Sequence, residues 1–289
     1  MDAPTAAAGH PVGWRIMSGY EDDLGVAHAL ANQADAVTMQ RFKALDLKVE
    51  TKPDLTPVSD ADRAVEELLR TSLGRTRPRD AVLGEEYGDT AGNAGFSTRR
   101  WVIDPIDGTK NYVRGVPVWA TLIALTDGRE PVVGMVSAPA LGRRWWAAKG
   151  IGAFTGRSAS SATRLAVSQV RKVEDASFAF SSVISWEDHG KLDGFLSLAR
   201  SCWRTRAYGD FWSHLLVAEG AVDMAAEPEV SLWDMAAIAV IVREAGGMFS
   251  SVDGDPWPGA GSGCTSNGLL HEVLLSHLGS SAIAPEHGG

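Results

Sequence analysis

The stretch that decides the fold is WVIDPIDGTKNY, residues 101–112. Its apolar start predicts a strand that ends at Asp104, and the turn signals after it carry Asp107. Pro105 fixes its own φ and donates no backbone N–H, which leaves the carbonyl of Ile106 free to point with the two aspartates toward one spot. We therefore expect three oxygen donors to converge at the end of this strand.

The residues after Asp107 favour an anion site at the start of a helix. Gly108 can adopt a φ that other residues avoid. The backbone amides of Gly108, Thr109 and Lys110 would then open toward an anion at the helix N-terminus. An Asp-Pro-x-Asp-Gly sequence also occurs as an ordinary turn, and the Lys110 side chain fits either a phosphate contact or a solvated position.

Two further acidic segments lie far from this stretch. Glu85 and Glu86 follow a short strand in LGEEYG, residues 83–88, where they form either a solvated edge or a desolvated pair that needs a positive partner. Asp234 lies in the first turn of the apolar helix predicted from SLWDMAAIAVIVREAGG, residues 231–247, as a helix-end residue or a ligand. Oxygen donors without a companion His or Cys favour Mg²⁺ or Mn²⁺ over zinc or copper.

The periodicity changes along the chain. Ser59 followed by Asp62 resembles an N-cap with an acidic first turn. Short β-branched and aromatic runs between turn signals predict a largely antiparallel sheet over residues 81–173, and SFAFSSVI predicts a strand at residues 177–184. Apolar residues at helical spacing predict helices at residues 20–45, 60–73, 189–200, 211–219 and 233–245.

Composition excludes several classes of protein. With 289 residues, 45% of them apolar and 22% charged, the chain is long enough for about two globular domains. The net charge is 27 − 36 = −9 without a long basic stretch, which disfavours nucleic acid as a partner. No apolar run approaches the roughly 18 residues of a membrane span. Two cysteines without a CxxC pair and a start without signal-peptide features predict a cytoplasmic protein.

The segments GEE, DPIDGT and WDMAAIAVIVREAGG, in this order, resemble the inositol monophosphatase superfamily of magnesium-dependent, lithium-sensitive phosphatases over roughly residues 20–280. KNYVRGVPVWATLIAL and YGDFWSHLLVAEGAVDMAAEPEVSLWD resemble its bacterial histidinol-phosphate phosphatase branch more particularly. The resemblance implies a layered αβαβα sandwich of the inositol monophosphatase and fructose-1,6-bisphosphatase type, and a homodimer. We expect a flexible arm at residues 1–18, an α+β domain with most metal ligands at 19–165, and a smaller α/β domain at 166–289.

The resemblance also implies the metal ligands. Glu85, Asp104 and the carbonyl of Ile106 match the ligands of a first metal, and Asp104, Asp107 and Asp234 match those of a second. Glu85 also matches a contributor to a weaker third position. The four carboxylates carry a charge of about −4, which two Mg²⁺ ions neutralise, and a bound phosphate dianion then favours a third cation. We expect two to three Mg²⁺ ions, with Mn²⁺ as a substitute.

By the same resemblance, Asp62 and the hydroxyl of Thr109 activate water, and Glu85 takes part in catalysis. Asp60 lies close to Asp62 and is the alternative acid. The amides of Gly108 and Thr109 would hold phosphate oxygens. Hydrolysis would proceed by in-line attack of a metal-activated water, without a covalent intermediate.

Substrate-binding residues are expected in the second half of the chain. Glu227 matches a position where relatives contact the organic part of the substrate, and Asp210 lies in the same region; Asp107 and Asp234 are assigned to substrate binding as well. An acidic rim suits a cationic leaving group, so we expect hydrolysis of L-histidinol phosphate in histidine biosynthesis. The alternatives are an inositol-1-phosphate phosphatase, then a nucleotide 3′-phosphatase or fructose-1,6-bisphosphatase, and outside this chemistry a non-catalytic ligand-sensing module.

Some side chains stay ambiguous in the sequence. Glu229 is either a substrate contact or a surface charge. His214 is expected to be a packing histidine, and core packing is favoured for Trp119, Trp212 and Trp233 over stacking on a cationic substrate.

Overall fold

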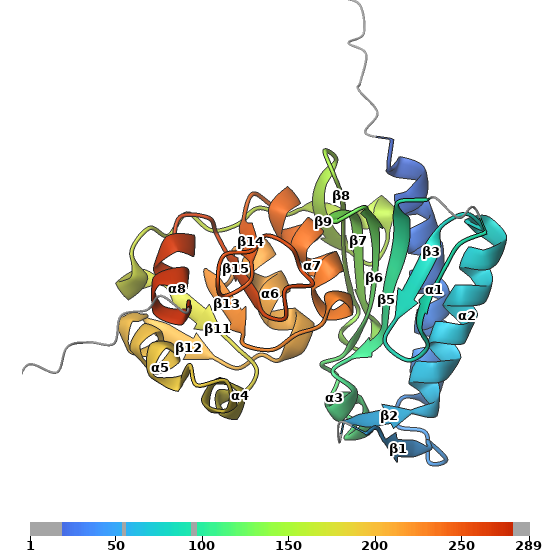
Figure 1. Cartoon of the computed structure of the whole chain (residues 1–289), viewed down its shortest axis with the longest axis horizontal. Coiled ribbons are helices and arrows are strands. Elements are labelled where there is room, and N and C mark those ends of the chain that lie inside the picture. Colours follow the sequence, from blue (N-terminus) through green and yellow to red (C-terminus); the bar gives the residue numbers. More distant parts are fainter. Residues whose placement is uncertain (1–18, 54–55, 94–96, 280–289) are drawn as a thin grey trace, which may run out of the picture.

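The computed structural model describes residues 19–53, 56–93 and 97–279. Figure 1 shows a large and a smaller β-sheet with a helical layer between them and a helical layer on each outer side, so the chain forms an αβαβα sandwich. This α+β layered fold confirms the expected fold class. The arm predicted at residues 1–18 lies outside the described residues.

The first outer layer consists of α1 (Glu21–Arg41) and α2 (Asp60–Thr76). Both helices bury an apolar face against the large sheet, in a core that includes Leu30 and Leu69. α1 ends at Arg41, four residues earlier than predicted, and Lys43 just after it adopts a φ of 62°. Between the helices, β1 (Val49–Thr51) pairs antiparallel with β2 (Pro57–Ser59).

Within the described residues the large sheet has eight strands, in the order β10-β9-β8-β7-β6-β5-β3-β4. All neighbours are antiparallel except β3 and β5, which are parallel, so the prediction of a largely antiparallel sheet is confirmed. The strands are β3 (Ala81–Gly84), β4 (Gly88–Thr90), β5 (Arg99–Asp107), β6 (Ala120–Asp127), β7 (Glu130–Ala138), β8 (Arg143–Ala148), β9 (Gly152–Gly156) and β10 (Thr163–Arg164). The short helix α3 (Thr109–Val113) follows β5.

The smaller sheet is mixed, with the strand order β12-β11-β13-β15-β14. Its strands are β11 (Ser177–Ala179), β12 (Arg204–Arg206), β13 (Met224–Glu227), β14 (Met248–Ser250) and β15 (Gly263–Ser266). On its outer side pack α4 (Val183–Asp188), α5 (Leu192–Ser201) and α8 (His271–Leu278). Short 3₁₀ helices lie at Pro139–Leu141, Ala159–Ser161 and Val173–Asp175.

The middle layer consists of α6 (Asp210–Ala218) and α7 (Leu232–Glu244). Every residue of α7 from Met235 to Val242 is buried. A helix that is apolar on all sides needs neighbours on all sides, and its place between two sheets provides them. The packing of α7 on the large sheet brings its first turn to the end of β5.

Three further element bounds were predicted wrongly. The strand predicted to end at Asp104 continues as β5 to Asp107, because pairing with β6 resumes after an irregularity between the two aspartates. The strand predicted at residues 177–184 ends at Ala179, because Ser182 caps α4 and the apolar pair Val183 and Ile184 belongs to that helix. The helix predicted from residue 189 begins only at Leu192. The proposed domain boundary between residues 165 and 166 falls between β10 and β11 and stays a prediction.

Candidate active site

The end of β5 carries two aspartates on one side of the sheet. The pairing of β5 with β6 is regular up to Asp104 and shifts register before Asp107. Side chains normally alternate between the faces of a strand, so residues three apart would point to opposite faces, and an irregularity here lets both acids face one site. Pro105 lies inside the irregular segment, and its carbonyl accepts a hydrogen bond from Thr121 Oγ1 at 2.8 Å.

Asp234 reaches the same place from the other half of the chain. It is the third residue of α7, and its Oδ2 accepts a hydrogen bond from the backbone N of Ser231 at 2.7 Å. Asp104, Asp107 and Asp234 each offer an oxygen, and these atoms lie within 4.8 Å of one another. The structure therefore brings together three of the acids that the sequence singled out.

Glu85 lies beside this trio without belonging to it. The parallel pairing of β3 with β5 continues to the backbone N of Glu85, which donates to the carbonyl of Ile103 at 3.2 Å. Its carboxylate and that of Glu86 both bind Lys52 Nζ, at 2.7 and 2.5 Å. Lys52 is the positive partner that an adjacent, partly buried glutamate pair requires. No spacing in the sequence pointed to this lysine.

The cluster is electrostatically strained. Burial raises the pKa of Asp104 well above its usual range, and the charges of Glu85, Asp107 and Asp234 raise it further. Burial and the charge of Asp210 do the same to the pKa of Asp107. Burial raises the pKa of Asp234 to about 7, although its hydrogen bond from Ser231 opposes the shift. Bound cations would therefore stabilise the ionised form of these carboxylates.

The donors fit a divalent metal ion. All are hard oxygen ligands, which suit Mg²⁺ or Mn²⁺. Oδ1 of Asp104 is buried and has no hydrogen-bond partner among the described residues, which is costly unless a ligand binds it. The carbonyl of Ile106, the expected backbone ligand, accepts from Thr109 Oγ1 at 2.9 Å and keeps a second lone pair.

Asp62 and Thr109 meet as expected. Oδ2 of Asp62 caps α2 by accepting from the N and Oγ of Ser59 at 2.8 and 2.6 Å. Its Oδ1 accepts from Thr109 Oγ1 at 3.4 Å, and burial raises the pKa of Asp62 to about 6. Asp60 instead pairs with Arg41 at 2.8 Å, so geometry favours Asp62 over this alternative.

Gly108 adopts a φ of 82° as the N-cap of α3. A Cβ there would lie 2.9 Å from the carbonyl oxygen of Val118 and 3.1 Å from Oδ2 of Asp210. Asn111 donates to that same Oδ2 at 3.0 Å and so connects α3 to the start of α6. The tight turn therefore places Asp210 directly beside the expected phosphate loop.

Glu227 lies at the end of β13, where it is only 8% exposed. Burial raises its pKa to about 8, and its Oε1 has no hydrogen-bond partner in the part of the chain that the structure describes. Burial also raises the pKa of Asp210, and the charge of Lys110 partly offsets this. Within the part of the chain that the structure describes, neither acid is in a salt bridge.

Other candidates lie outside this cluster. The side chain of Glu229 is 73% exposed and lies 3.8 Å from His189, as a surface charge. His214 is a buried packing residue whose Nδ1 contacts Thr265 Oγ1 at 2.8 Å. Trp119 is fully buried against Tyr112. Trp212 and Trp233 pack at the margin of the central core.

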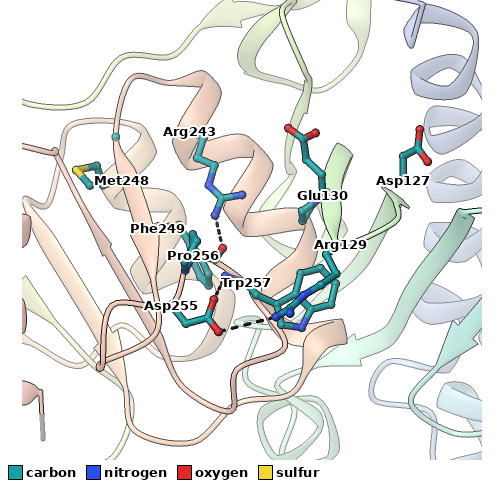
Figure 2. A pocket seen from close by; sticks show the side chains of 11 residues that line it. Asp127, Arg129, Glu130, Arg243, Met248, Phe249, Asp255, Pro256 and Trp257 are labelled. Atoms are coloured by element: carbon teal, nitrogen blue, oxygen red, sulfur yellow. Dashed lines mark hydrogen bonds and ion pairs between the residues drawn. The ribbon is translucent and has the colours of Figure 1, made fainter.

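A separate pocket of about 880 Å³ lies at the opposite end of α7 (Figure 2). Arg243 there donates to the carbonyl of Pro256, and Arg129 lies 3.8 Å from Asp255. Arg243 follows Asp234 by nine residues on one helix, which corresponds to about 14 Å. This pocket is therefore not part of the acidic site.

A layered αβαβα fold with such a carboxylate cluster at its centre defines a class of metal-dependent phosphatases. The chain belongs to the inositol monophosphatase family, whose model matches residues 20–282. It is thus a phosphatase that acts on small phosphate monoesters. Among the described residues, no helix is long and apolar enough to cross a membrane.

Individual proteins are similar to this chain over most of its length. A histidinol-phosphatase of Streptomyces coelicolor is 66% identical, over 91% of this chain and 98% of its own length. A histidinol-phosphatase of Mycobacterium tuberculosis is 57% identical, over 89% of this chain and 98% of its own. The crystal structure of the extragenic suppressor protein suhB from Bartonella henselae superposes with a TM-score of 0.81 at 26% identity, covering 90% of this chain and all of that one.

Proposed function

We propose that this phosphatase hydrolyses L-histidinol phosphate to L-histidinol and phosphate. The observation that carries the proposal is a pair of acids beside the metal-ligand candidates, the half-buried Asp210 and the buried Glu227. Among the described residues neither acid forms a salt bridge. Two relatives that are more than half identical to this chain carry the name histidinol-phosphatase, which supports the same substrate.

The charge of the leaving group decides between candidate substrates. Histidinol has an amine and an imidazole, whereas inositol offers only hydroxyl groups. A cation beside Glu227 would stabilise the carboxylate that burial otherwise holds protonated, and it would form charge-assisted hydrogen bonds. A neutral polyol supplies no positive charge, so Glu227 would stay protonated beside it and no charge-assisted hydrogen bond would form.

We assign the metal ligands as the family resemblance implies. Glu85, Asp104 and the Ile106 carbonyl would hold one ion, and Asp104, Asp107 and Asp234 another, with Glu85 also near a weaker third position. The resident ion would be Mg²⁺, with two to three per site and Mn²⁺ as a substitute. Lithium sensitivity, a homodimer and a cytoplasmic location belong to the same proposal and rest on the family resemblance and the composition.

The chain's own residues would position the reaction. Bound divalent ions would supply Lewis-acid activation of water and phosphate. Asp62 orients the hydroxyl of Thr109, so that this hydroxyl can relay a proton from the attacking water to the carboxylate. The amides of Gly108 and Thr109 would hold phosphate oxygens. Asp210 and Glu227 would bind the cationic alcohol that leaves.

The test is turnover of purified protein on L-histidinol phosphate, inositol 1-phosphate and fructose 1,6-bisphosphate, side by side with Mg²⁺. We expect kcat/KM to be highest for L-histidinol phosphate, and Glu227→Gln to lower that value while changing the value for inositol 1-phosphate much less. A tenfold preference for inositol 1-phosphate would overturn the assignment in favour of an inositol phosphatase.

A further inference from the structure

We propose that Glu66 is a positioning residue that holds Glu85 in place for metal binding. This inference rests on the proposed role of Glu85 as a ligand. Glu66 lies on α2 and is fully buried, although it was not among the residues that the sequence singled out. A buried carboxylate needs several hydrogen bonds or a cation to be stable, so its partners show what it does.

The partners of Glu66 are the backbone groups next to Glu85. Oε2 of Glu66 accepts from the N of Glu86 at 2.7 Å, and Oε1 accepts from the N of Tyr87 at 3.1 Å. On its other side, Glu85 is fixed by its own N, which donates to the carbonyl of Ile103 at 3.2 Å. The backbone of the candidate ligand is therefore held on both sides, by β5 and by Glu66.

Arg70 completes this arrangement one helical turn later. Its Nε binds Oε1 of Glu66 at 2.7 Å, which compensates the buried charge. Its Nη1 donates to Thr90 Oγ1 at 3.0 Å, and its Nη2 donates to the carbonyl of Gly88. The guanidinium thus binds the β3–β4 hairpin, whose turn contains Glu85.

The same helix face carries Asp62, four residues before Glu66. Residues four apart lie above one another on a helix, so α2 presents both carboxylates toward the same end of the large sheet. Asp62 contacts Thr109, and Glu66 holds the turn with Glu85. One rigid element therefore fixes the distance between a proposed metal ligand and the proposed water-activating pair.

Gly84 supports this assignment independently. A Cβ at this position would lie 2.0 Å from Oε1 of Glu66, so only glycine leaves room for the carboxylate beneath the turn. Gly84→Ala should displace the Glu66 side chain without removing its charge. It provides a second variant that acts on the same contact from the other side.

The experiment measures Mn²⁺ binding by the electron paramagnetic resonance signal of the free ion, in the presence of inorganic phosphate. Glu66→Gln places an amide N–H₂ against backbone donors, and we expect the affinity for Mn²⁺ to fall by about tenfold, as for other residues that orient metal ligands. Gly84→Ala should give a similar loss. The matched control is Glu67→Gln, at the next and exposed position of α2, which should bind Mn²⁺ like the wild type.

A second readout separates positioning from folding. In Glu66→Gln, the Mg²⁺ concentration for half-maximal turnover should rise by about the same tenfold factor, while kcat at saturating Mg²⁺ stays near the wild-type value. A variant that melts at a lower temperature but keeps wild-type Mn²⁺ affinity would overturn the inference. A wild-type protein that binds no Mn²⁺ would overturn the metal-site proposal together with this one.

Discussion

Asp107 has a structural role as a hydrogen-bond acceptor and a proposed role as a metal ligand. Its Oδ2 accepts a hydrogen bond from the backbone N of Phe211 at 2.7 Å, and the charges of Asp210 and Asp234 oppose its ionisation. Asp107→Asn keeps the acceptor for Phe211 and removes one negative charge. We expect Mg²⁺-dependent phosphate release to be abolished, while the melting temperature in EDTA is unchanged or higher.

Phosphate release and thermal unfolding of this variant check the expectation. Asp193→Asn, at an exposed position of α5, serves as the control with normal turnover. Retained turnover in Asp107→Asn would refute its role as a ligand.

Thr109 is a second residue whose role in catalysis can be tested by a single substitution. Its hydroxyl contacts both Asp62 and the carbonyl of Ile106, so its removal leaves the carboxylates of the candidate metal ligands in place. Thr109→Val should lower kcat by about 10²- to 10⁴-fold, the usual contribution of a positioned acid or base. Mn²⁺ affinity should change little. Thr109→Ser, which keeps the hydroxyl, should restore much of the rate; equal rates for the serine and valine variants would disprove a proton relay.

At the scale of elements, the β5–α3 turn depends on one glycine. Gly108 has a φ of 82° and is packed against the carbonyl of Val118, whereas Gly128 in the β6–β7 turn has a φ of 59°, and a Cβ there would meet nothing within 4 Å. A left-handed φ costs an L-residue about 1–2 kcal/mol. We expect Gly128→Ala to lose about this much stability and Gly108→Ala to lose more.

Urea unfolding in EDTA compares the two alanine variants directly. The phosphate-holding proposal adds that Gly108→Ala raises KM for the phosphate ester, while Gly128→Ala leaves it unchanged. Equal losses of stability in both variants would mean that contact with Val118 contributes nothing at this turn.

For the whole molecule, the acidic centre links stability to pH and to metal. Burial raises the pKa of Asp234 from 3.8 to about 7 and that of Glu227 from 4.5 to about 8. The folded, metal-free protein therefore holds protons more tightly than the unfolded chain, so these groups stabilise it fully below about pH 4. That contribution is lost as the pH rises through the folded pKa values, up to about pH 8.

Mg²⁺ should reverse much of this loss because it favours the ionised carboxylates. We expect the metal to raise the melting temperature more at about pH 8 than at about pH 5. Thermal melts in EDTA and in Mg²⁺ at the two pH values measure the difference. An equal Mg²⁺ effect at both values would contradict a site formed by these raised-pKa acids.

The sequence by itself determined the local structure and most of the candidate donors. The strand that carries Asp104, the cap formed by Ser59 and Asp62, and the apolar helix with Asp234 near its start all follow from periodicity and short motifs, which act within a few residues. The same reasoning failed at Val183, because a short apolar pair fits a strand or a buried helix equally well.

Only the tertiary structure decided which of these groups meet. Asp234 reaches Asp104 because α7 packs between two sheets. The periodicity of the two segments does not encode that approach, and before the fold only the family resemblance assigned both acids to one metal. The contacts of Lys52 and Glu66 also depend on the tertiary structure. In the sequence neither differs from other charged residues, and only the folded β3–β4 turn brings them against Glu85 and Glu86. Hydrogen bonds and charges act over a few ångströms in space, so residues distant in the chain acquire their chemistry only when the layers assemble.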